Sequence, residues 1–453
     1  MDWDLVVVGG GAAGLSAARA GARSGKRTVL VSDGPLGGDC TFTGCVPSKT
    51  LIESAAQRLN FKLAMVRVRD VVERIAATED ASVLSDEGVV VCEGRACFVA
   101  PRTLSVGSER LTGSRVVIAT GSAPMVPSVP GLDAAPYLTN ETVFDLTDRP
   151  ESLAIVGGGP IGCELAQAFN RLGVAVTIVE AAERLLPGED AEAGSVLAEV
   201  FQREGIGLRL GTALVRAAKD PERGIDLHLD DGSVVSTARV LVAAGRGPDT
   251  GGLALEAGGV TMDDRGFIRT DDHLATSAPG VFAIGDVTGR LPFTHAADEM
   301  GRIAVANAFG RFRSRPFRVS AIPWVTFTEP EIARIGMTES QAAAVGGRVA
   351  YLPMTEVDRA ITAGYTDGFV KLLAGPRRIG GNAGGGKLLG ATIVSERAGE
   401  LIHEVALAMG TGMFTGRLAQ TVHAYPTWSI AVRQAASQFF VTTGGRQARP
   451  AQG

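Results

Sequence analysis

The distribution of apolar residues predicts an α/β protein in which short buried strands alternate with helices. The runs "LVVV" (5–8) and "LAIV" (153–156) are uninterrupted Val, Leu, Ile and Ala, as expected for parallel strands buried on both faces. Each run is followed by a glycine cluster, an alanine-rich stretch and a second apolar run. The segments 4–33 and 152–180 align with each other without a gap. We therefore expect the same strand, turn, helix, strand unit twice.

Both units carry the pattern G-x-G-x-x-G at the first turn. In such a turn the first glycine permits the tight bend, the second lets the backbone approach a pyrophosphate, and the third lets helix and strand pack closely. The phosphates would then lie at the helix N-terminus. One copy is weak evidence, but two copies in this context predict two bound dinucleotides. The glycines are Gly9, Gly11 and Gly14, and Gly157, Gly159 and Gly162.

The residue that ends the second strand of each unit tests this interpretation. An acidic side chain there hydrogen-bonds a ribose 2′-hydroxyl. In the second unit it is Glu180, which favours NADH because a 2′-phosphate would meet a carboxylate; NADPH stays possible. In the first unit the position is Ser32, a departure from the pattern, with Asp33 beside it.

Chain length and charge further limit the classes of protein to which the sequence can belong. A chain of 453 residues is too long for one core, so several domains are expected. The net charge is -5 with both signs mixed, which predicts no nucleic-acid partner. No apolar run is long enough to span a membrane, and the start "MDWD" lacks the positive charge of a secretion signal. We expect a cytoplasmic protein, in which five cysteines do not form a disulfide framework.

The segment "GGDCTFTGCVPSK" (37–49) places Cys40 and Cys45 ahead of a helix-like run. On a regular helix residues five apart point about 140° away from each other, so pairing requires a distortion that Gly44 can absorb. Pro47 suits a first helical turn, which would stabilise a thiolate on Cys45. A structural staple, a metal clip and a redox centre are the alternatives. No further Cys or His ligand is adjacent, so no metal site is predicted.

Together these motifs resemble the pyridine nucleotide-disulfide oxidoreductases, the flavoprotein family of dihydrolipoamide dehydrogenase, glutathione reductase and mercuric reductase. The similarity covers nearly the whole chain and favours the redox alternative. It rests on both glycine motifs, the Cys segment, "ATG" (119–121), "GDV" (285–287), "THAADEMGRIAVANA" (294–308) and "FTEPEIARIGMTESQA" (327–342).

The resemblance implies two Rossmann-like dinucleotide-binding domains, for FAD and NAD, and a C-terminal α+β domain that forms a homodimer. The FAD-binding domain would comprise 1–148 and 271–318, and the NAD(P)-binding domain 149–270. The interface domain would comprise 319–443. We expect residues 444–453 to be a disordered tail.

The resemblance also implies residue roles. Cys45 would face the flavin and Cys40 would attack the acceptor, while Lys49 would lie near the flavin and pair with Glu164. The cysteines outside this segment, Cys92, Cys97 and Cys163, are expected to be inert. Asp286 at a strand end would accept hydrogen bonds from sugar-like hydroxyls, although it also suits an ordinary turn. Further cofactor-binding candidates are Gly38, Thr120, Gly121, Gly245, Arg246 and Gly285.

The C-terminal region departs from the family. Its disulfide reductases usually carry a His-Pro-Thr segment whose His pairs with a Glu five residues later and acts from the other subunit. Here Tyr425 precedes Pro426, and Ile430 replaces the Glu. His423 is either the proton shuttle or a structural histidine, and Tyr425 can donate a hydrogen bond.

Three functions are compatible with these features. The first is an enzyme that passes electrons from NADH through FAD to the Cys40–Cys45 disulfide and on to a small thiol or disulfide acceptor. The second is a mercuric-reductase-like, quinone or metal-ion reductase that uses the same flavin. Its mercury form is disfavoured because the C-terminus "VTTGGRQARPAQG" lacks Cys. The third is a redox sensor with little turnover.

Overall fold

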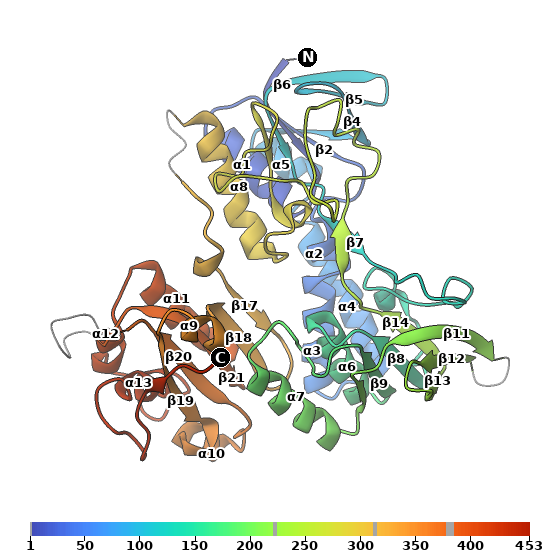
Figure 1. Ribbon diagram of the computed structural model, residues 1–453. Helices are drawn as coiled ribbons and strands as arrows, with labels where there is room; N and C mark the ends of the chain where they lie inside the picture. Colours follow the sequence, from blue (N-terminus) through green and yellow to red (C-terminus); the bar gives the residue numbers. More distant parts are fainter. Residues whose placement is uncertain (1, 221–223, 311–314, 377–384) are drawn as a thin grey trace. The chain divides into compact units, whose positions relative to one another are not determined.

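The protein, seen here as a computed structural model, is described for residues 2–220, 224–310, 315–376 and 385–453 (Figure 1). The chain divides into two units, each assembled from separated segments. The first contains Met1–Ser128, Pro136–Arg149 and Leu241–Arg318, and the second contains Val129–Ala135, Pro150–Val240 and Val319–Gly453. The predicted domain boundaries stay predictions.

The first unit is built on a seven-stranded sheet of order β3-β2-β1-β6-β5-β4, with β16 pairing with β6. The central pairs β1·β2, β1·β6, β2·β3 and β6·β16 are parallel, as the continuous apolar runs predict. The strands are β1 (Asp2–Val8), β2 (Thr28–Ser32), β3 (Val89–Glu93), β4 (Ala96–Ala100), β5 (Thr103–Val106), β6 (Glu109–Ile118) and β16 (Val281–Ala283), with β7 (Ser122–Pro124) and β15 (Arg246–Pro248) forming a separate ribbon.

Helices of this unit pack on the sheet and on each other. Helices α1 and α8 lie side by side (Figure 1), and Gly301 permits the approach because a Cβ there would lie 2.8 Å from Cβ of Ser16. The Ser16 hydroxyl donates a hydrogen bond to the Asp298 carbonyl at 2.8 Å. The helices are α1 (Ala12–Arg23), α2 (Gly38–Phe42), α3 (Cys45–Ala56), α4 (Phe61–Ala76), α5 (Ala81–Asp86) and α8 (Thr294–Phe309).

The second unit begins with the other predicted repeat. Strands β8 (Ser152–Val156), β9 (Ala175–Glu180) and β10 (Gly207–Leu210) form parallel pairs, and the sheet order is β10-β9-β8-β14. Its remaining elements are α6 (Pro160–Arg171), α7 (Ala191–Arg203) and the start of β14 (Arg239–Val242), within which the boundary between the units falls, with an antiparallel sheet of β11 (Leu214–Asp220), β12 (Gly224–Leu229) and β13 (Val234–Thr237). The predicted duplication and the α/β class are confirmed.

The C-terminal part of this unit is a six-stranded antiparallel sheet of order β17-β18-β21-β20-β19-β22. Alternate side chains of these strands and the apolar sides of α11 and α13 share one core. The strands are β17 (Pro323–Thr326), β18 (Glu331–Gly336), β19 (Arg348–Pro353), β20 (Phe369–Ala374), β21 (Leu388–Ser395) and β22 (Arg449–Pro450), and the helices are α9 (Glu339–Ala343), α10 (Asp358–Ala363), α11 (Ala398–Gly410), α12 (Thr415–Gln420) and α13 (Ile430–Ser437).

The C-terminal tail is not the disordered segment that we expected from residue 444 onward. Strand β22 pairs antiparallel with β19, and the Arg449 guanidinium donates to the Glu339 carboxylate at 2.6 Å. The free edge of β19 supplies unpaired backbone groups, and Glu339 supplies a partly buried counter-charge. Composition alone does not indicate either partner.

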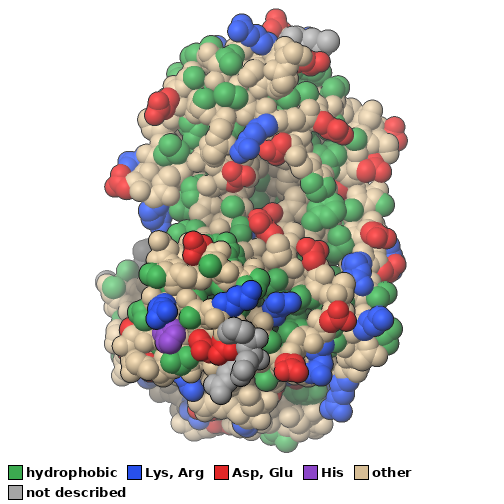
Figure 2. Space-filling model, turned by 90° about the vertical axis from the view of Figure 1, so that its right-hand side faces the viewer, with side chains coloured by type: hydrophobic (Ala, Val, Ile, Leu, Met, Phe, Trp, Pro, Cys, Tyr) green, Lys and Arg blue, Asp and Glu red, His purple; other side chains and the backbone are tan. Residues whose placement is uncertain are grey.

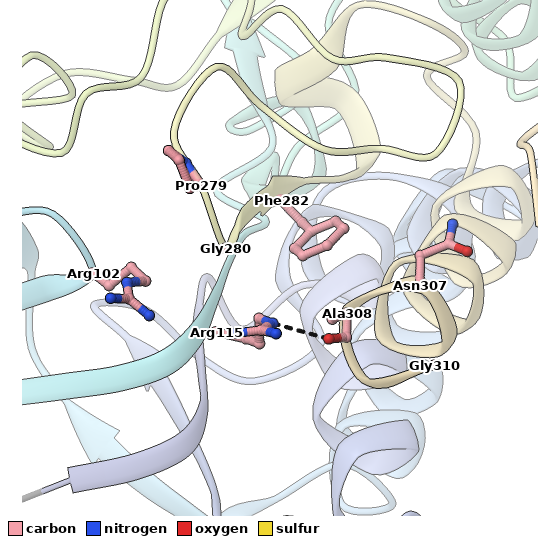
Figure 3. Close-up of a pocket in the computed structure, with 8 residues that line it drawn as sticks. All are labelled: Arg102, Arg115, Pro279, Gly280, Phe282, Asn307, Ala308 and Gly310. Atoms are coloured by element: carbon pink, nitrogen blue, oxygen red, sulfur yellow. Dashed lines mark hydrogen bonds between the residues drawn. The ribbon is translucent and has the colours of Figure 1, made fainter. Parts of the chain in front are cut away.

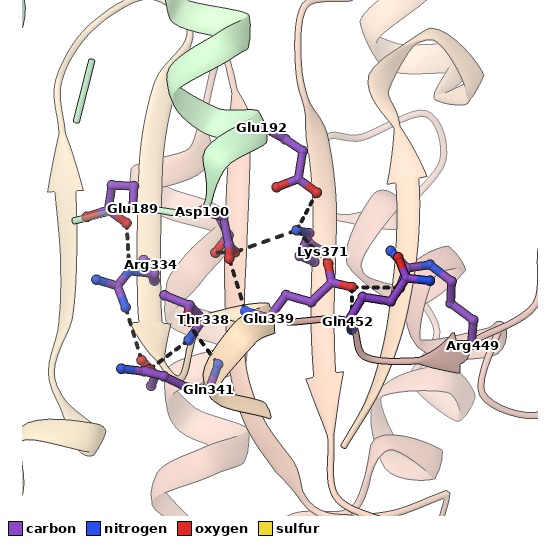
Figure 4. A network of polar contacts seen from close by, with 12 residues as sticks. Glu189, Asp190, Glu192, Arg334, Thr338, Glu339, Gln341, Lys371, Arg449 and Gln452 are labelled. Carbon is purple, nitrogen blue, oxygen red and sulfur yellow. Dashed lines mark hydrogen bonds and ion pairs between the residues drawn. The ribbon is translucent and has the colours of Figure 1, made fainter. Parts of the chain in front are cut away.

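A buried ion cluster joins the two parts of the second unit (Figure 4). The Lys371 side chain on β20 is 0% exposed, and its Nζ lies 2.8 Å from Glu192 Oε1, 2.8 Å from Glu339 Oε2 and 3.8 Å from Asp190 Oδ2. Burial lowers the pKa of Lys371, but the hydrogen bonds to both Glu residues and the charge of Asp190 more than offset it, so the pKa is raised. Burial raises the pKa of Glu339, but hydrogen bonds from Lys371 and Arg449 more than offset this effect, so the pKa is lowered overall.

Replacing Lys371 with Met is therefore expected to destabilise the protein by about 3 to 5 kcal/mol, because it leaves the buried Asp190 carboxylate without its cation and Glu339 with Arg449 alone. The lowered pKa of Glu339 stabilises the fold above its ordinary value of 4.5, and this contribution is lost as pH falls. The raised pKa of Lys371 stabilises the fold below 10.5 and is lost as pH rises beyond the folded value. Urea unfolding should show the largest difference between wild type and variant from about pH 5 to pH 10.

The matched control is Arg203→Met, which breaks an ion pair with Asp367 whose two side chains are 57% and 45% exposed. It should cost less than about 1 kcal/mol. Equal losses for the two variants would contradict the role assigned to the Lys371 cluster.

Candidate active site

The two glycine turns have nearly the same geometry. Gly9 and Gly157 adopt φ of 112° and 117° in the tight bend. A Cβ on Gly14 would lie 1.8 Å from the Gly9 carbonyl oxygen, and one on Gly162 would lie 1.9 Å from that of Gly157. Both close contacts require glycine, as predicted for the first and third positions.

The second glycine of each motif faces open space. A Cβ on Gly11 or Gly159 would meet nothing within 4 Å, so packing of the protein itself does not require glycine there. Each is the N-cap of the following helix and makes no side-chain capping bond. The N–H groups of the first turn are thus available to an anion in α1 and, after Pro160 at the first position, in α6. This cradle fits the pyrophosphate of a dinucleotide in both units.

The first unit offers further polar groups to FAD. The Thr120 hydroxyl oxygen is buried without a hydrogen-bond partner among the described residues, which suits a hydroxyl that pairs with a ligand. The residue before it borders the first glycine turn, because a Cβ on Gly9 would lie 2.3 Å from the Ala119 carbonyl oxygen. The glycines named from the resemblance, Gly38, Gly121, Gly245 and Gly285, have φ of 58°, 79°, 122° and 71°.

The strand-end residues differ as the sequence indicates. Glu180 accepts hydrogen bonds from the backbone N–H groups of Gly158 at 2.5 Å and Ala182 at 2.7 Å, which fix its carboxylate beside the second turn. Ser32 is buried and its hydroxyl donates to the Gly34 carbonyl at 2.9 Å. Asp33 is exposed and lies 3.9 Å from Arg95. The structure does not bring Asp33 into the turn.

The Cys segment begins against the first glycine turn. Gly37 N–H donates to the Gly10 carbonyl at 2.9 Å, and a Cβ on Gly38 would lie 2.8 Å from Cα of Gly11. Cys40 lies on α2 and Cys45 is the first residue of α3, one position further into the helix than predicted. The two cysteines are in the reduced form and are not joined by a disulfide in this structure. A hydrogen bond with Cys45, and then burial, raise the pKa of Cys40, which shows that the two side chains meet.

Thr294 is a residue of this site that sequence reasoning missed. It is the first residue of α8, and its hydroxyl lies 3.2 Å from Sγ of Cys45. A hydroxyl at this distance can donate to a thiolate. The segment 294–308 stands out in the sequence only as part of the family resemblance, and nothing in it signals a contact with a residue so distant in the chain.

Arg246, expected from the resemblance to bind a cofactor, contacts three residues of the first unit, and its cofactor contact stays a prediction. Its Nε donates to the Ser122 hydroxyl at 2.8 Å, Nη1 to the Asn140 amide oxygen at 3.3 Å, and Nη2 to the Asp39 carboxylate. Ser122 in turn donates to Asp286 at 2.8 Å. Arg246 thus connects the residue before Cys40 with the strand end at Asp286.

Asp286 ends this chain of hydrogen bonds and is partly buried. Burial raises its pKa, while the hydrogen bond from Ser122 and the charge of Arg246 act in the opposite direction. A partly buried carboxyl at the carboxyl end of a parallel strand, next to the glycine turn, suits hydrogen bonds with ligand hydroxyls. The contact of Asp286 with FAD stays a prediction.

Lys49 and Glu164 lie in different units. Lys49 is on α3 of the first unit, and Glu164 is on α6 of the second, where its carboxylate accepts a hydrogen bond from the Phe327 N–H at 2.8 Å. Glu164 is 5% exposed. Their pairing stays a prediction.

His423 forms a His–Glu pair, although with a carboxylate that the sequence did not indicate. Its Nε2 lies 3.0 and 3.1 Å from the Glu404 carboxylate oxygens, and its Nδ1 lies 2.9 Å from the Thr421 carbonyl oxygen. Both partners are acceptors, so only the doubly protonated ring makes both bonds. Tyr425 is 69% exposed, and its hydroxyl donates to Asp358 at 2.9 Å, a bond that raises the Tyr425 pKa.

The described residues provide two further facts. None of their helices is long and apolar enough to cross a membrane, and none of their His, Cys, Asp and Glu side chains form a group of three or more that could hold a metal ion. On the face shown in Figure 2, acidic and basic side chains are interspersed, in keeping with the mixed charge of the sequence.

Sequence profiles of known families match most of the chain. The profile for pyridine nucleotide-disulphide oxidoreductases matches residues 3–301, and that for the dimerisation domain of these enzymes matches 322–436. A mercuric reductase of Streptomyces lividans is 34% identical over 465 residues, which cover 96% of each chain. A dihydrolipoyl dehydrogenase of Chlorobaculum tepidum is 36% identical over 464 residues, again 96% of each chain.

Solved structures agree with this relationship. The Cu(II) complex of the HOCl-induced flavoprotein disulfide reductase RclA from Escherichia coli has a TM-score of 0.88 and 29% identity, and the match covers 96% of this chain and 99% of that one. The chain belongs to the pyridine nucleotide-disulphide oxidoreductase family. It is an NAD(P)H-dependent flavoprotein disulfide oxidoreductase with FAD as its flavin, and its dimerisation domain indicates a homodimer.

The geometry of the first glycine turn predicts that Gly14→Ala lowers stability, whereas Gly11→Ala lowers FAD binding. Gly14→Ala should destabilise the apoprotein by about 1 to 3 kcal/mol or more, because the new Cβ overlaps the Gly9 carbonyl. Gly11→Ala should leave apoprotein stability within about 0.5 kcal/mol of wild type, because its Cβ meets open space, yet reduce bound FAD. Urea unfolding of the apoproteins and flavin absorbance of the purified proteins measure the two effects. Full flavin content in Gly11→Ala would contradict the assignment of this turn.

Proposed function

We propose that the protein transfers two electrons from NADH through FAD to a Cys40–Cys45 disulfide, which then reduces a small-molecule acceptor. The observation that carries the proposal is the contact between the two cysteine side chains in a segment packed on the first glycine turn. FAD, when bound, accepts the hydride of the nicotinamide and passes on its two electrons. The hydride thus supplies two electrons and one proton, and the disulfide becomes one thiol and one thiolate with no net proton taken from solvent.

The surroundings of Cys40 and Cys45 favour a different role for each cysteine. Cys45 begins a twelve-residue helix and contacts the Thr294 hydroxyl, and both features stabilise a thiolate at Cys45. The raised pKa of Cys40 keeps that thiol protonated beside the Cys45 sulfur. Cys45 therefore holds the negative charge, and Cys40 is the sulfur that exchanges with the acceptor. Lys49 and Glu164 are assigned to the flavin side by the resemblance.

NADH is proposed as the preferred reductant. The Glu180 carboxylate is held by two backbone N–H groups beside the second glycine turn. A ribose 2′-hydroxyl can donate to this carboxylate, whereas a 2′-phosphate would be repelled by it. A cytoplasmic location stays a prediction.

The acceptor is a small disulfide or, as the second candidate, a soft metal ion. The second candidate, a metal ion, is favoured by the contacts and positions of the two possible proton donors, His423 and Tyr425. His423 is held by Glu404 and Thr421, and Tyr425 occupies the position where a disulfide reductase has its catalytic His. A metal ion bound by two thiolates needs no proton for its reduction. Mercuric reductases are among the relatives, and one related structure is a Cu(II) complex.

Anaerobic reduction with NADH tests the proposed electron route. Wild type should develop long-wavelength absorbance from contact of the Cys45 thiolate with the flavin, and Cys45→Ser should lose it entirely. Cys40→Ser should keep it, because this substitution leaves the Cys45 sulfur in place. Cys97→Ser is the control and should match wild type. Undiminished absorbance in Cys45→Ser would overturn the proposal.

Turnover of the same variants separates the acceptors. Cys40→Ser should reduce neither small disulfides nor Hg(II) or Cu(II) above background, because both need the exchanging sulfur. Wild type should prefer a disulfide if the first candidate holds and a metal ion if the second does. Quinone reduction by NADH that survives Cys40→Ser, with no activity on the other acceptors, would contradict both.

A further inference from the structure

A pocket of about 440 Å³ lies in the first unit, away from the glycine turn (Figure 3). Its wall includes Arg102 from the turn between β4 and β5, Arg115 from β6, and Gly280 just before β16. The end of α8, at Ala308 and Gly310, completes it. These segments lie at the entry of the parallel strands β6 and β16, whereas the dinucleotide turn and Asp286 follow their carboxyl ends.

Two guanidinium groups meet at this pocket. Arg102 Nη1 and Arg115 Nη1 donate to the same acceptor, the Ser114 carbonyl oxygen, at 3.2 and 2.8 Å. Arg115 Nε also donates to the Ala308 carbonyl at 2.9 Å, which offsets the negative end of α8. Each guanidinium has five N–H donors, so most of their donors remain for another partner.

Nothing in the described residues neutralises this pair of charges. No acidic residue is among those lining the pocket, and neither arginine forms an ion pair within the described part of the chain. Two like charges brought to one oxygen repel each other, and an anion bound between them would be attracted by both. The site thus favours a ligand with negative charge.

The backbone is shaped to bring the two arginines together. Gly280 has φ of 79°, and a Cβ on it would lie 3.1 Å from Cδ of Arg102 and 3.8 Å from Cδ of Arg115, so both stems pack over this glycine. Arg102 itself has φ of 58°, a left-handed conformation that glycine adopts without strain and arginine does not. Strain of this kind is typical of residues held for a function.

We propose that this pocket binds a small phosphate-bearing anion. Planar guanidinium groups match the oxygens of a phosphate with paired hydrogen bonds, and two of them suit a dianion better than a single carboxylate. The pocket is large enough for a phosphate monoester as well as for the free ion. The site lies at the opposite end of the strands from the FAD turn, so it is independent of the proposed electron route.

Calorimetric titration of the FAD-loaded enzyme with inorganic phosphate and with glycerol 3-phosphate, at constant ionic strength, tests the proposal. Arg102→Gly should bind both anions at least roughly tenfold more weakly, because it removes charge-assisted hydrogen bonds. Its melting temperature should equal or exceed that of wild type, because glycine relieves the left-handed backbone. Arg115→Gln should weaken binding in the same direction. Tighter binding of glycerol 3-phosphate than of phosphate would identify a monoester as the ligand, and equal binding the free ion.

The control is Arg265→Ala, which removes one arginine of the same unit whose side chain is 74% exposed. It lowers the net charge by the same amount and should bind both anions as wild type does. The proposal is overturned if wild type binds neither anion, or if Arg102→Gly binds them within twofold of Arg265→Ala.

Discussion

The close approach of helices α2 and α3 at Gly44 is the constraint on which the redox segment depends. A Cβ at this position would lie 2.8 Å from the Asp39 carbonyl oxygen and 3.3 Å from Cα of Cys40. Any side chain here would push the two helices apart. Because Cys40 lies on one helix and Cys45 starts the other, this approach decides whether their sulfur atoms meet. The rest of the site holds that geometry in place.

Three sets of contacts support the segment from outside. The first glycine turn packs against Gly37 and Gly38, so the pair is fixed relative to the cofactor cradle. Arg246 holds Asp39, the residue before Cys40, and leads through Ser122 to Asp286. Thr294 contacts Cys45 from the start of α8. Each contact joins the cysteines to a segment that also borders the first glycine turn, so flavin binding and thiol chemistry share one support.

Short sequence patterns predict those features of the fold whose physical requirement lies within one short segment. The glycine spacing specifies both turns, because the overlap of Gly14 with Gly9 involves residues only five apart. Continuous apolar runs specify the parallel strands. Gly44 stands out because five-residue spacing on a regular helix cannot pair two cysteines. In each case the physical requirement acts within one short segment.

Sequence reasoning missed or misplaced the contacts between segments that are distant in the chain. Thr294 approaches Cys45 across more than half of the chain, and His423 pairs with Glu404, a residue for which sequence reasoning predicted no role. Strand β22 forms because β19 has a free edge with which it pairs, and because the Glu339 carboxylate accepts a hydrogen bond from Arg449. Such pairings depend on how helices and strands pack, and a single sequence carries no period or motif that reports them.

Differential alkylation measures whether Cys40 and Cys45 form a disulfide that NADH reduces. The oxidised holoenzyme and the same protein reduced anaerobically with NADH are treated with iodoacetamide, and each cysteine is quantified by mass spectrometry. We expect Cys40 and Cys45 to be protected in the oxidised protein and to become alkylated after NADH, while Cys92, Cys97 and Cys163 do not change. Equal labelling of Cys40 and Cys45 before and after NADH would contradict it.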